Sequence, residues 1–166
     1  MSICVATGAI ERETVIPFYV MLAGILIARL LGVVWPALDD WRMATRAGLS
    51  VMFVFTGLAH FGRTRHDLVR MVPPQLPNPS ALVTLTGVAE LAGALGLVIP
   101  SLARWAAYGL MVLLVAMFPA NIHAARMGHT IGGRPHTRMA LRVPLQVLWI
   151  GMLWWSADTD FLWFHI

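Results

Sequence analysis

The chain has 166 residues, of which 58% are hydrophobic and only 12% are charged, and its net charge is +4. Soluble domains carry charge on about a quarter of their residues, so this composition excludes a soluble domain and indicates a single integral membrane domain. The positive charge comes from 12 arginines with no lysine, and they lie mostly between apolar runs, which favours membrane orientation over nucleic-acid binding.

The N-terminal part is predicted to be a short tail, residues 1–14, followed by a membrane-spanning helix over residues 15–35. The tail holds Cys4, the only cysteine, which excludes an intramolecular disulfide or a Cys-x-x-Cys relay. The apolar run of about 20 residues can cross a hydrocarbon core of about 30 Å, and is too long for a secretory signal. Arg29 lies about 9 Å from the end of this helix. It either reaches the interface or pairs with Glu90.

A second span is predicted over residues 43–61, and it carries Thr56 and His60 on one helix face, because they are four residues apart. The connection that follows, residues 62–79, is basic and contains four prolines, which rule out a continuous helix. Its apolar residues suit the bilayer surface. It is either a basic interfacial loop or a lid over the bundle.

The third span, residues 80–100, has Glu90 as its only ionisable residue, near mid-membrane. A carboxylate there is disfavoured by roughly 2.5 kcal/mol or more, so Glu90 should face the protein interior and find a partner, or be protonated. Small residues four apart let helices approach closely, and they occur at Ala89 and Gly93 and at Ala92 and Gly96. This helix is therefore predicted to be the centre of the bundle, with Glu90 either functional or a structural hydrogen-bonding group.

A fourth span is predicted over residues 102–124, with a kink near Pro119 that lies just before Asn121 and His123. Kinks with polar residues beside them often line cavities, although many are purely structural. A basic, glycine-rich loop over residues 126–138 follows this span.

The fifth predicted span, residues 139–156, contains Arg142, Pro144 and Gln146, and a tail over residues 157–166 follows it. With five spans, the N-terminus and the two basic connections lie on one side, which the positive-inside rule makes cytoplasmic, and the C-terminus lies outside. Tryptophan prefers the membrane interface, and six tryptophans fall on the outer side in this arrangement: Trp35, Trp41, Trp105, Trp154, Trp155 and Trp163.

Eight polar residues follow a gradient of depth when each is counted at 1.5 Å per residue from the cytoplasmic end of its span. The depths are about 5 Å or less for His60, Asn121, His123 and Arg142, about 10 Å for Thr56, Thr86 and Gln146, and about 15 Å for Glu90. If these side chains face one another, they form a polar path from the cytoplasm to mid-membrane. The pattern favours a hydrogen-bonding pocket for an amphipathic ligand, or a proton relay.

A metal site formed by His60, His123 and Glu90 is disfavoured, because about 10 Å of depth separates the carboxyl from the two imidazoles. A haem held by the two histidines is disfavoured to a similar degree.

Five motifs together resemble the DoxX-like family of small bacterial membrane proteins: GLAHFG (57–62), MVPPQLPNP (71–79), GVAELAGALGL (87–97), FPANIHAA (118–125) and LRVPLQ (141–146). The resemblance covers residues 43–156 and implies an all-α, four-helix membrane domain, to which the helix over residues 15–35 is added. It also implies the cell membrane of a bacterium. The positions that look typical of the family are His60, Glu90, Asn121, Arg142 and Gln146.

The resemblance implies a quinone-linked or otherwise redox-associated membrane subunit, with a quinone or lipid as ligand and a soluble or membrane redox partner. Glu90 and His60 are then the candidate catalytic residues. The candidate ligand-binding residues are Thr56, Thr86, Asn121, His123, Arg142 and Gln146. The paired thiols of one branch of the family are missing, which speaks against a disulfide role. Two alternatives stay open: a non-catalytic accessory or assembly factor, and a small intramembrane enzyme that uses Glu90 and His60 for acid–base chemistry on a lipid.

Overall fold

The structure is a computed structural model of the whole chain. It describes the backbone of residues 3–127, 130–131, 134–135 and 139–157, and the side chains of residues 15–36, 38–124 and 141–157. Residues 158–166 of the predicted C-terminal tail, with Trp163, lie outside the described residues, as do the side chains of Arg126, Arg134 and Arg138.

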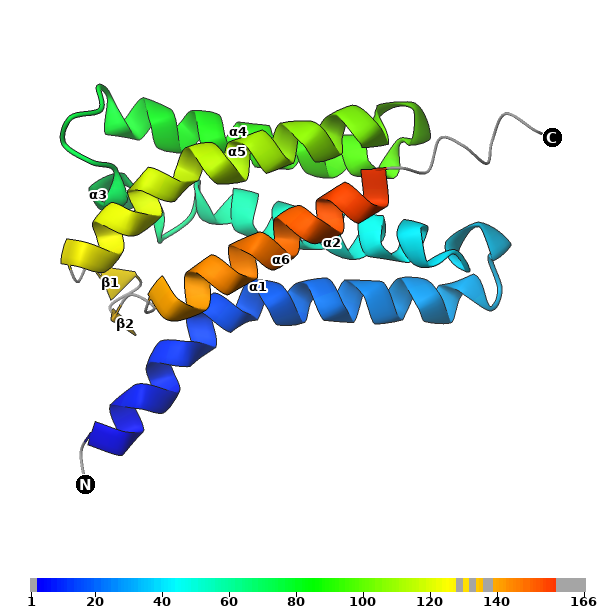
Figure 1. Cartoon of the computed structure of the whole chain (residues 1–166), viewed down its shortest axis with the longest axis horizontal. Coiled ribbons are helices and arrows are strands. Elements are labelled where there is room, and N and C mark those ends of the chain that lie inside the picture. Colours follow the sequence, from blue (N-terminus) through cyan, green and yellow to red (C-terminus); the bar gives the residue numbers. More distant parts are fainter. Residues whose placement is uncertain (1–2, 128–129, 132–133, 136–138, 158–166) are drawn as a thin grey trace.

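The described residues form an all-α structure, as predicted, with six α-helices and one short 3₁₀ helix (Figure 1). The α-helices are α1 (Ile3–Gly32), α2 (Trp41–Ala59), α3 (Arg65–Met71), α4 (Pro79–Val98), α5 (Pro100–Met127) and α6 (Met139–Ala157), and the 3₁₀ helix is η1 (Pro36–Leu38). Two short antiparallel strands, β1 (Thr130–Ile131) and β2 (Arg134–Pro135), pair in the connection before α6.

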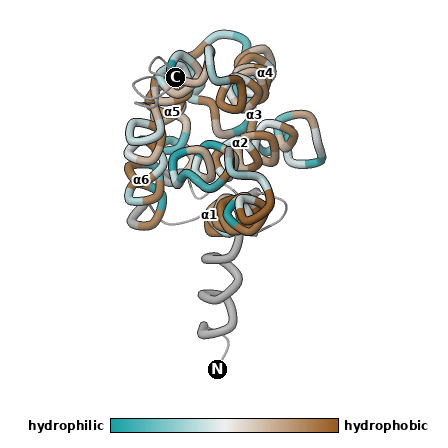
Figure 2. The backbone as a smooth tube through the Cα atoms, turned by 90° about the vertical axis from the view of Figure 1, so that its right-hand side faces the viewer, coloured by the Kyte–Doolittle hydropathy of each residue, from teal (hydrophilic) through white to brown (hydrophobic). Residues whose placement is uncertain are grey.

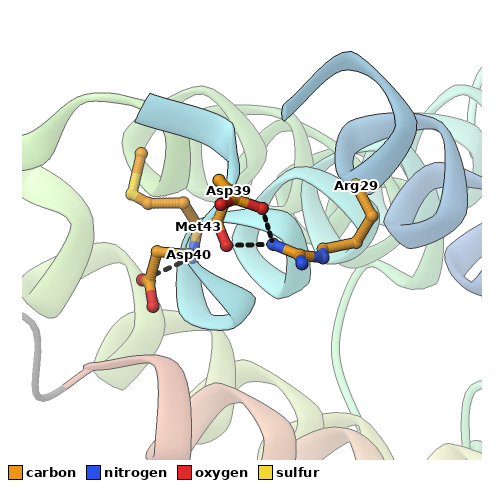
Figure 3. Close-up of polar contacts among 4 residues, drawn as sticks. All are labelled: Arg29, Asp39, Asp40 and Met43. Atoms are coloured by element: carbon orange, nitrogen blue, oxygen red, sulfur yellow. Dashed lines mark hydrogen bonds and ion pairs between the residues drawn. The ribbon is translucent and has the colours of Figure 1, made fainter. Parts of the chain in front are cut away.

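The boundaries of the helices follow local chemistry. Asp40 caps α2, because its side chain accepts a hydrogen bond of 3.2 Å from the backbone N–H of Met43 (Figure 3). Pro79 is placed in the first turn of α4, and Pro100 begins α5, where the missing proline N–H is not needed. The helix α1 begins at Ile3 and ends at Gly32, whereas the predicted span ran from residue 15 to residue 35.

Arg29 pairs with the connection between α1 and α2, so the predicted alternative of a pair with Glu90 is wrong. Its Nη1 lies 2.8 Å from Asp39 Oδ1 and also donates to the Asp39 carbonyl (Figure 3). Its guanidinium lies over the ring of Trp41, 4.5 Å from the ring centroid. The long side chain therefore carries its charge to the end of α1, where an acid and an aromatic ring meet it.

Four of the long helices form a closed ring. The contacts between elements join α2 to α4, α4 to α5, α5 to α6, and α6 back to α2. The helix α1 packs mainly on α2, outside this ring, as the end-on view in Figure 2 shows. Long helices that follow one another along the chain are therefore all neighbours, and the short helix α3 lies in the connection between α2 and α4.

Small residues set the closest helix contacts. A Cβ atom at Gly48 would lie 2.4 Å from Ile25 Cγ1 and 2.7 Å from the Met21 carbonyl oxygen, so α1 and α2 almost touch there. On α4, a Cβ atom at Gly93 would lie 2.5 Å from Leu110 of α5. The small residues of the third predicted span thus do bring α4 close to a neighbouring helix.

In the part of the chain that the structure describes, three helices are long and apolar enough to cross a membrane: Val15–Gly32, Pro79–Val98 and Pro100–Ala124. Their outward faces carry large apolar side chains, such as Leu26 at 62% exposure, Leu95 at 64% and Val112 at 69%. Polar side chains, in contrast, lie inside the bundle, among them Ser50, Glu90 and Gln146. An apolar surface of this extent around a partly polar interior is typical of a protein that lipid surrounds.

The two basic connections of the chain lie at one end of the bundle. Figure 1 shows α3, β1 and β2 together at this end, next to the start of α4, the end of α5 and the start of α6. The connections from α1 to α2 and from α4 to α5 lie at the opposite end. We call the first end the α3 end and use this name below.

Candidate functional site

The contact between α2 and α4 encloses a polar cluster of Thr56, His60 and Glu90, which we call the Glu90 cluster. The Thr56 hydroxyl donates a hydrogen bond of 2.7 Å to Glu90 Oε2. His60 Nδ1 lies 3.0 Å from the Thr56 carbonyl oxygen. Glu90 and His60 are only 4% and 5% exposed. The structure thus brings together both candidate catalytic residues and one candidate ligand-binding residue.

Glycines make this contact close. A Cβ atom at Gly57 would lie 2.9 Å from Leu91 Cγ and 3.3 Å from Glu90 Cβ, and one at Gly87 would lie 2.6 Å from His60 Cβ. One turn towards the other end, Ser50 donates a hydrogen bond of 2.7 Å to the Ala94 carbonyl. The face of α4 that carries Glu90 therefore lies flat against α2, and the carboxyl has no route to lipid on that side.

Only one oxygen of the Glu90 carboxyl is used within the described residues. Oε2 accepts from Thr56, whereas the structure gives Oε1 no hydrogen bond from any described side chain or backbone group. A carboxyl that is fixed through one oxygen can still donate or accept one hydrogen bond through the other.

Arg65 of α3 joins the α3 end to the Glu90 cluster, a role that the sequence pattern does not indicate. Its Nη1 donates to the His60 carbonyl at 3.1 Å, and its Nη2 donates to the Ser80 carbonyl at 3.1 Å and to Thr84 Oγ1 at 2.8 Å. His123 of α5 also contacts α3, with Nδ1 3.2 Å from the Met71 carbonyl oxygen. The connection predicted as either a loop or a lid, residues 62–79, thus contains the short helix α3, which lies at the end of the bundle next to His60.

A second polar group lies between α5 and α6. Arg142 Nη1 donates to Asn121 Oδ1 at 2.7 Å, and Gln146 Nε2 donates to the Leu114 carbonyl at 2.7 Å. Pro119 lies one turn beyond Leu114 in α5 and disturbs the backbone hydrogen bonds of this region. Gln146 therefore satisfies a backbone carbonyl near the proline, which is a structural role.

The predicted polar path does not form one continuous network in the part of the chain that the structure describes. Thr86 donates to Leu82 and Val83 of its own helix, at 3.0 and 3.1 Å, and not to Glu90. No hydrogen bond between described residues joins the Glu90 cluster to Arg142 or Gln146. Among the described side chains, no three His, Cys, Asp or Glu residues come together in a way that could hold a metal ion.

An open apolar groove lies between α1 and α2, away from these polar groups. It is lined by small and aliphatic side chains, including Ala23, Gly24, Ile27, Ala47 and Val51. None of the predicted site residues lines it.

Comparison with known proteins gives one match. The family model of a domain of unknown function, DUF8561, matches residues 49–157. The chain belongs to this family. Neither the curated proteins nor the solved structures contain a match.

The family match covers the ring of four helices from Leu49 in α2 to the end of α6. It therefore includes the Glu90 cluster and the Arg142–Asn121 pair, whereas α1 lies before it. Membership defines a shared domain without assigning an activity to it.

Proposed function

We propose that the protein is a DoxX-like integral membrane subunit that binds a quinone and works with a redox partner. In this proposal all five long helices span the cell membrane of a bacterium, with the N-terminus and the α3 end in the cytoplasm. The ring of α2, α4, α5 and α6, with α1 packed on its outside, supports this arrangement. The basic residues of the two connections at the α3 end also support it.

One observation carries the proposal: the buried Glu90 carboxyl is held through one oxygen and keeps the other available. Ionisable residues inside membrane helices are expensive, and they commonly mark ligand or proton pathways. A quinone presents carbonyl oxygens that accept hydrogen bonds, and its apolar ring and tail suit a site within the bilayer. Glu90 donates the hydrogen bond to the quinone carbonyl, and His60 and Thr56 hold the α2 side of the site.

Reduction of a quinone to a quinol takes up two electrons and two protons. The redox partner supplies both electrons in this proposal, and Glu90 passes on the two protons one after the other, regaining each from water on the cytoplasmic side. The partner binds from the membrane or from the cytoplasm, next to the α3 end.

The experiment measures the melting temperature of the purified protein in detergent with and without added ubiquinone or menaquinone. The wild type should gain several degrees, because a ligand that binds the folded state stabilises it. Glu90→Gln should fold but lose most of this gain, since the amide keeps the shape of the side chain without an acidic proton. Ser50→Ala is the matched control, because it removes another α2–α4 hydrogen bond and leaves Glu90 intact.

A wild-type protein that retains no quinone and shows no shift with either quinone would contradict the proposal. An equal shift in Glu90→Gln and in the wild type would contradict the role of Glu90.

A second candidate function is a non-catalytic accessory or assembly factor, and the bond between Thr56 and Glu90 favours it directly. This bond joins α2 to α4 beside the close contacts of Gly57 and Gly87. Glu90 can therefore have a purely structural role that stabilises the packing of the two helices. In that case Glu90→Gln should be neutral for every function, whereas Glu90→Leu should lower the folded yield. A defined membrane protein that co-purifies with both the wild type and Glu90→Gln would support this second function.

A further inference from the structure

Arg142 is a cation inside the bundle without a described counterion. It lies on α6, is partly buried, and makes one hydrogen bond, from Nη1 to the neutral amide oxygen of Asn121. Its Nε is buried and has no acceptor among the described residues. A charged group that is removed from water is costly unless an opposite charge compensates it.

Neither α5, nor α6, nor the connection between them contains an acid. Residues 91–157 contain no Asp and no Glu, although they contain five arginines: Arg104, Arg126, Arg134, Arg138 and Arg142. Glu90, the nearest acid along the chain before this segment, lies between α2 and α4 and bonds to Thr56. Asp158 is the next acid along the sequence, 16 residues after Arg142. The segment that forms α5, α6 and their connection therefore carries arginines without any acid.

The geometry of the guanidinium indicates the type of partner. Asn121 occupies Nη1, whereas the buried Nε and the adjacent Nη2, which form the side edge of the guanidinium, have no acceptor among the described residues. Two parallel N–H groups at this edge match two oxygens of a phosphate or carboxylate, and such bidentate pairs are among the strongest hydrogen bonds in proteins.

The depth of Arg142 suits a lipid phosphate. Arg142 comes three residues after Met139, where α6 begins, so it lies about 4.5 Å inside the end of the helix. Headgroups occupy a layer of roughly 5–7 Å on each side of the hydrocarbon core. The partly exposed side chain can therefore meet a phosphate in the leaflet at the α3 end, whereas Gln146, one turn deeper, is 7% exposed and already bonded.

We propose that Arg142, positioned by Asn121, binds a phosphate oxyanion between α5 and α6, and that a phospholipid headgroup supplies it. This site is separate from the proposed quinone site at Glu90 and does not depend on it. Bound lipid would compensate the charge of Arg142, which has no counterion among the described side chains, and would fix α5 to α6 near Pro119.

The test uses the full chain in detergent and measures binding of a short-chain phosphatidylglycerol through the melting temperature, with native mass spectrometry as a second readout. Arg142→Gln should weaken the apparent affinity at least tenfold. Arg142→Lys should weaken it several-fold, because lysine keeps the charge but lacks the two parallel N–H donors of the guanidinium. Asn121→Ala keeps the arginine but removes the group that positions it, so it should weaken the apparent affinity several-fold. This variant provides the test if Arg142→Gln does not fold.

Arg63→Gln is the matched control, because it removes an exposed arginine at the same end of the bundle and should leave the affinity unchanged. Diacylglycerol, which lacks the phosphate, should not bind. Saturable binding of inorganic phosphate that depends on Arg142 would support the oxyanion site and would identify the free ion as its source.

Three results would overturn the proposal: equal affinity in Arg142→Gln and the wild type, an equal loss in Arg63→Gln, or binding of diacylglycerol as tight as that of the phospholipid.

Discussion

At the scale of single residues, Thr56 and Thr86 differ in what their hydroxyl groups do. Both are partly buried threonines in long helices, yet Thr56 donates across to Glu90 at 2.7 Å, while Thr86 donates only to carbonyls of its own helix. A threonine that donates a hydrogen bond to its own helix adds little to the stability of the contact between helices. A comparison of Thr56 with Thr86 therefore distinguishes the effect of a hydrogen bond between two helices from that of a hydrogen bond within one helix.

We predict that Thr56→Val lowers the stability of the bundle by about 1–2 kcal/mol, because valine has nearly the same shape but leaves the buried Glu90 carboxyl without its donor. Thr86→Val should change the stability by less than about 0.5 kcal/mol. Unfolding in mixed detergent, followed by circular dichroism, measures both. Equal effects of the two substitutions would show that the hydroxyl of Thr56 does not hold Glu90.

The sequence predicts some residue contacts well and others not at all. The four-residue spacing of Thr56 and His60 places them on one face, and the cost of a carboxyl in a membrane places Glu90 inside, and the structure has both features. The pairing of Arg142 with Asn121 was not predictable, because sequence gives depth along a helix but not the direction in which a side chain points. The sequence left the environment of Arg29 undecided for the same reason, and in the structure Arg29 pairs with Asp39.

At the scale of helices, the contact of α1 with α2 depends on Gly24 and Gly48. A Cβ atom at Gly24 would lie 2.9 Å from the Cα of Gly48, and one at Gly48 would meet Ile25 and the Met21 carbonyl oxygen. Backbone atoms cannot move aside as the end of a flexible side chain can, so any larger residue forces the two helices apart.

We predict that Gly48→Ala destabilises the protein by about 1–3 kcal/mol through this overlap, in spite of the better helix propensity of alanine. Gly109→Ala is the control, because no atom lies within 4 Å of a Cβ atom built there, and it should be neutral or slightly stabilising. Thermal unfolding of the two variants, compared with the wild type, measures the difference. A neutral Gly48→Ala would contradict the close contact of α1 and α2.

Helix positions were more predictable than helix ends. The apolar runs indicate all five long helices, and α4 over Pro79–Val98 lies within two residues of the predicted span at each end. The short helix α3 and the early end of α1 at Gly32 were missed, because short interfacial segments and chain turns depend on what they pack against. The contacts of Arg65 with α2 and α4 fix α3 in place, and no local pattern encodes them.

At the scale of the whole molecule, the placement of the connections makes a prediction about membrane topology. The α3 end carries both basic connections (Figure 1), whereas exposed tryptophans such as Trp35 and Trp105 lie near the connections of the other end. With five spans, a reporter fused after residue 78 should behave as cytoplasmic and one fused after residue 166 as periplasmic. The same location for both reporters would mean an even number of crossings between them and would overturn the five-span arrangement.

The proposed function requires that the Glu90 carboxyl, enclosed between α2 and α4, contacts the bound quinone. Infrared difference spectroscopy of the purified protein, recorded with and without quinone, tests this contact most directly, because the carboxyl bands shift when their hydrogen bonding changes. We predict a carboxyl band change in the wild type and in Ser50→Ala that is absent in Glu90→Gln. Quinone binding that leaves the carboxyl bands unchanged, or an unaltered band change in Glu90→Gln, would contradict the claim.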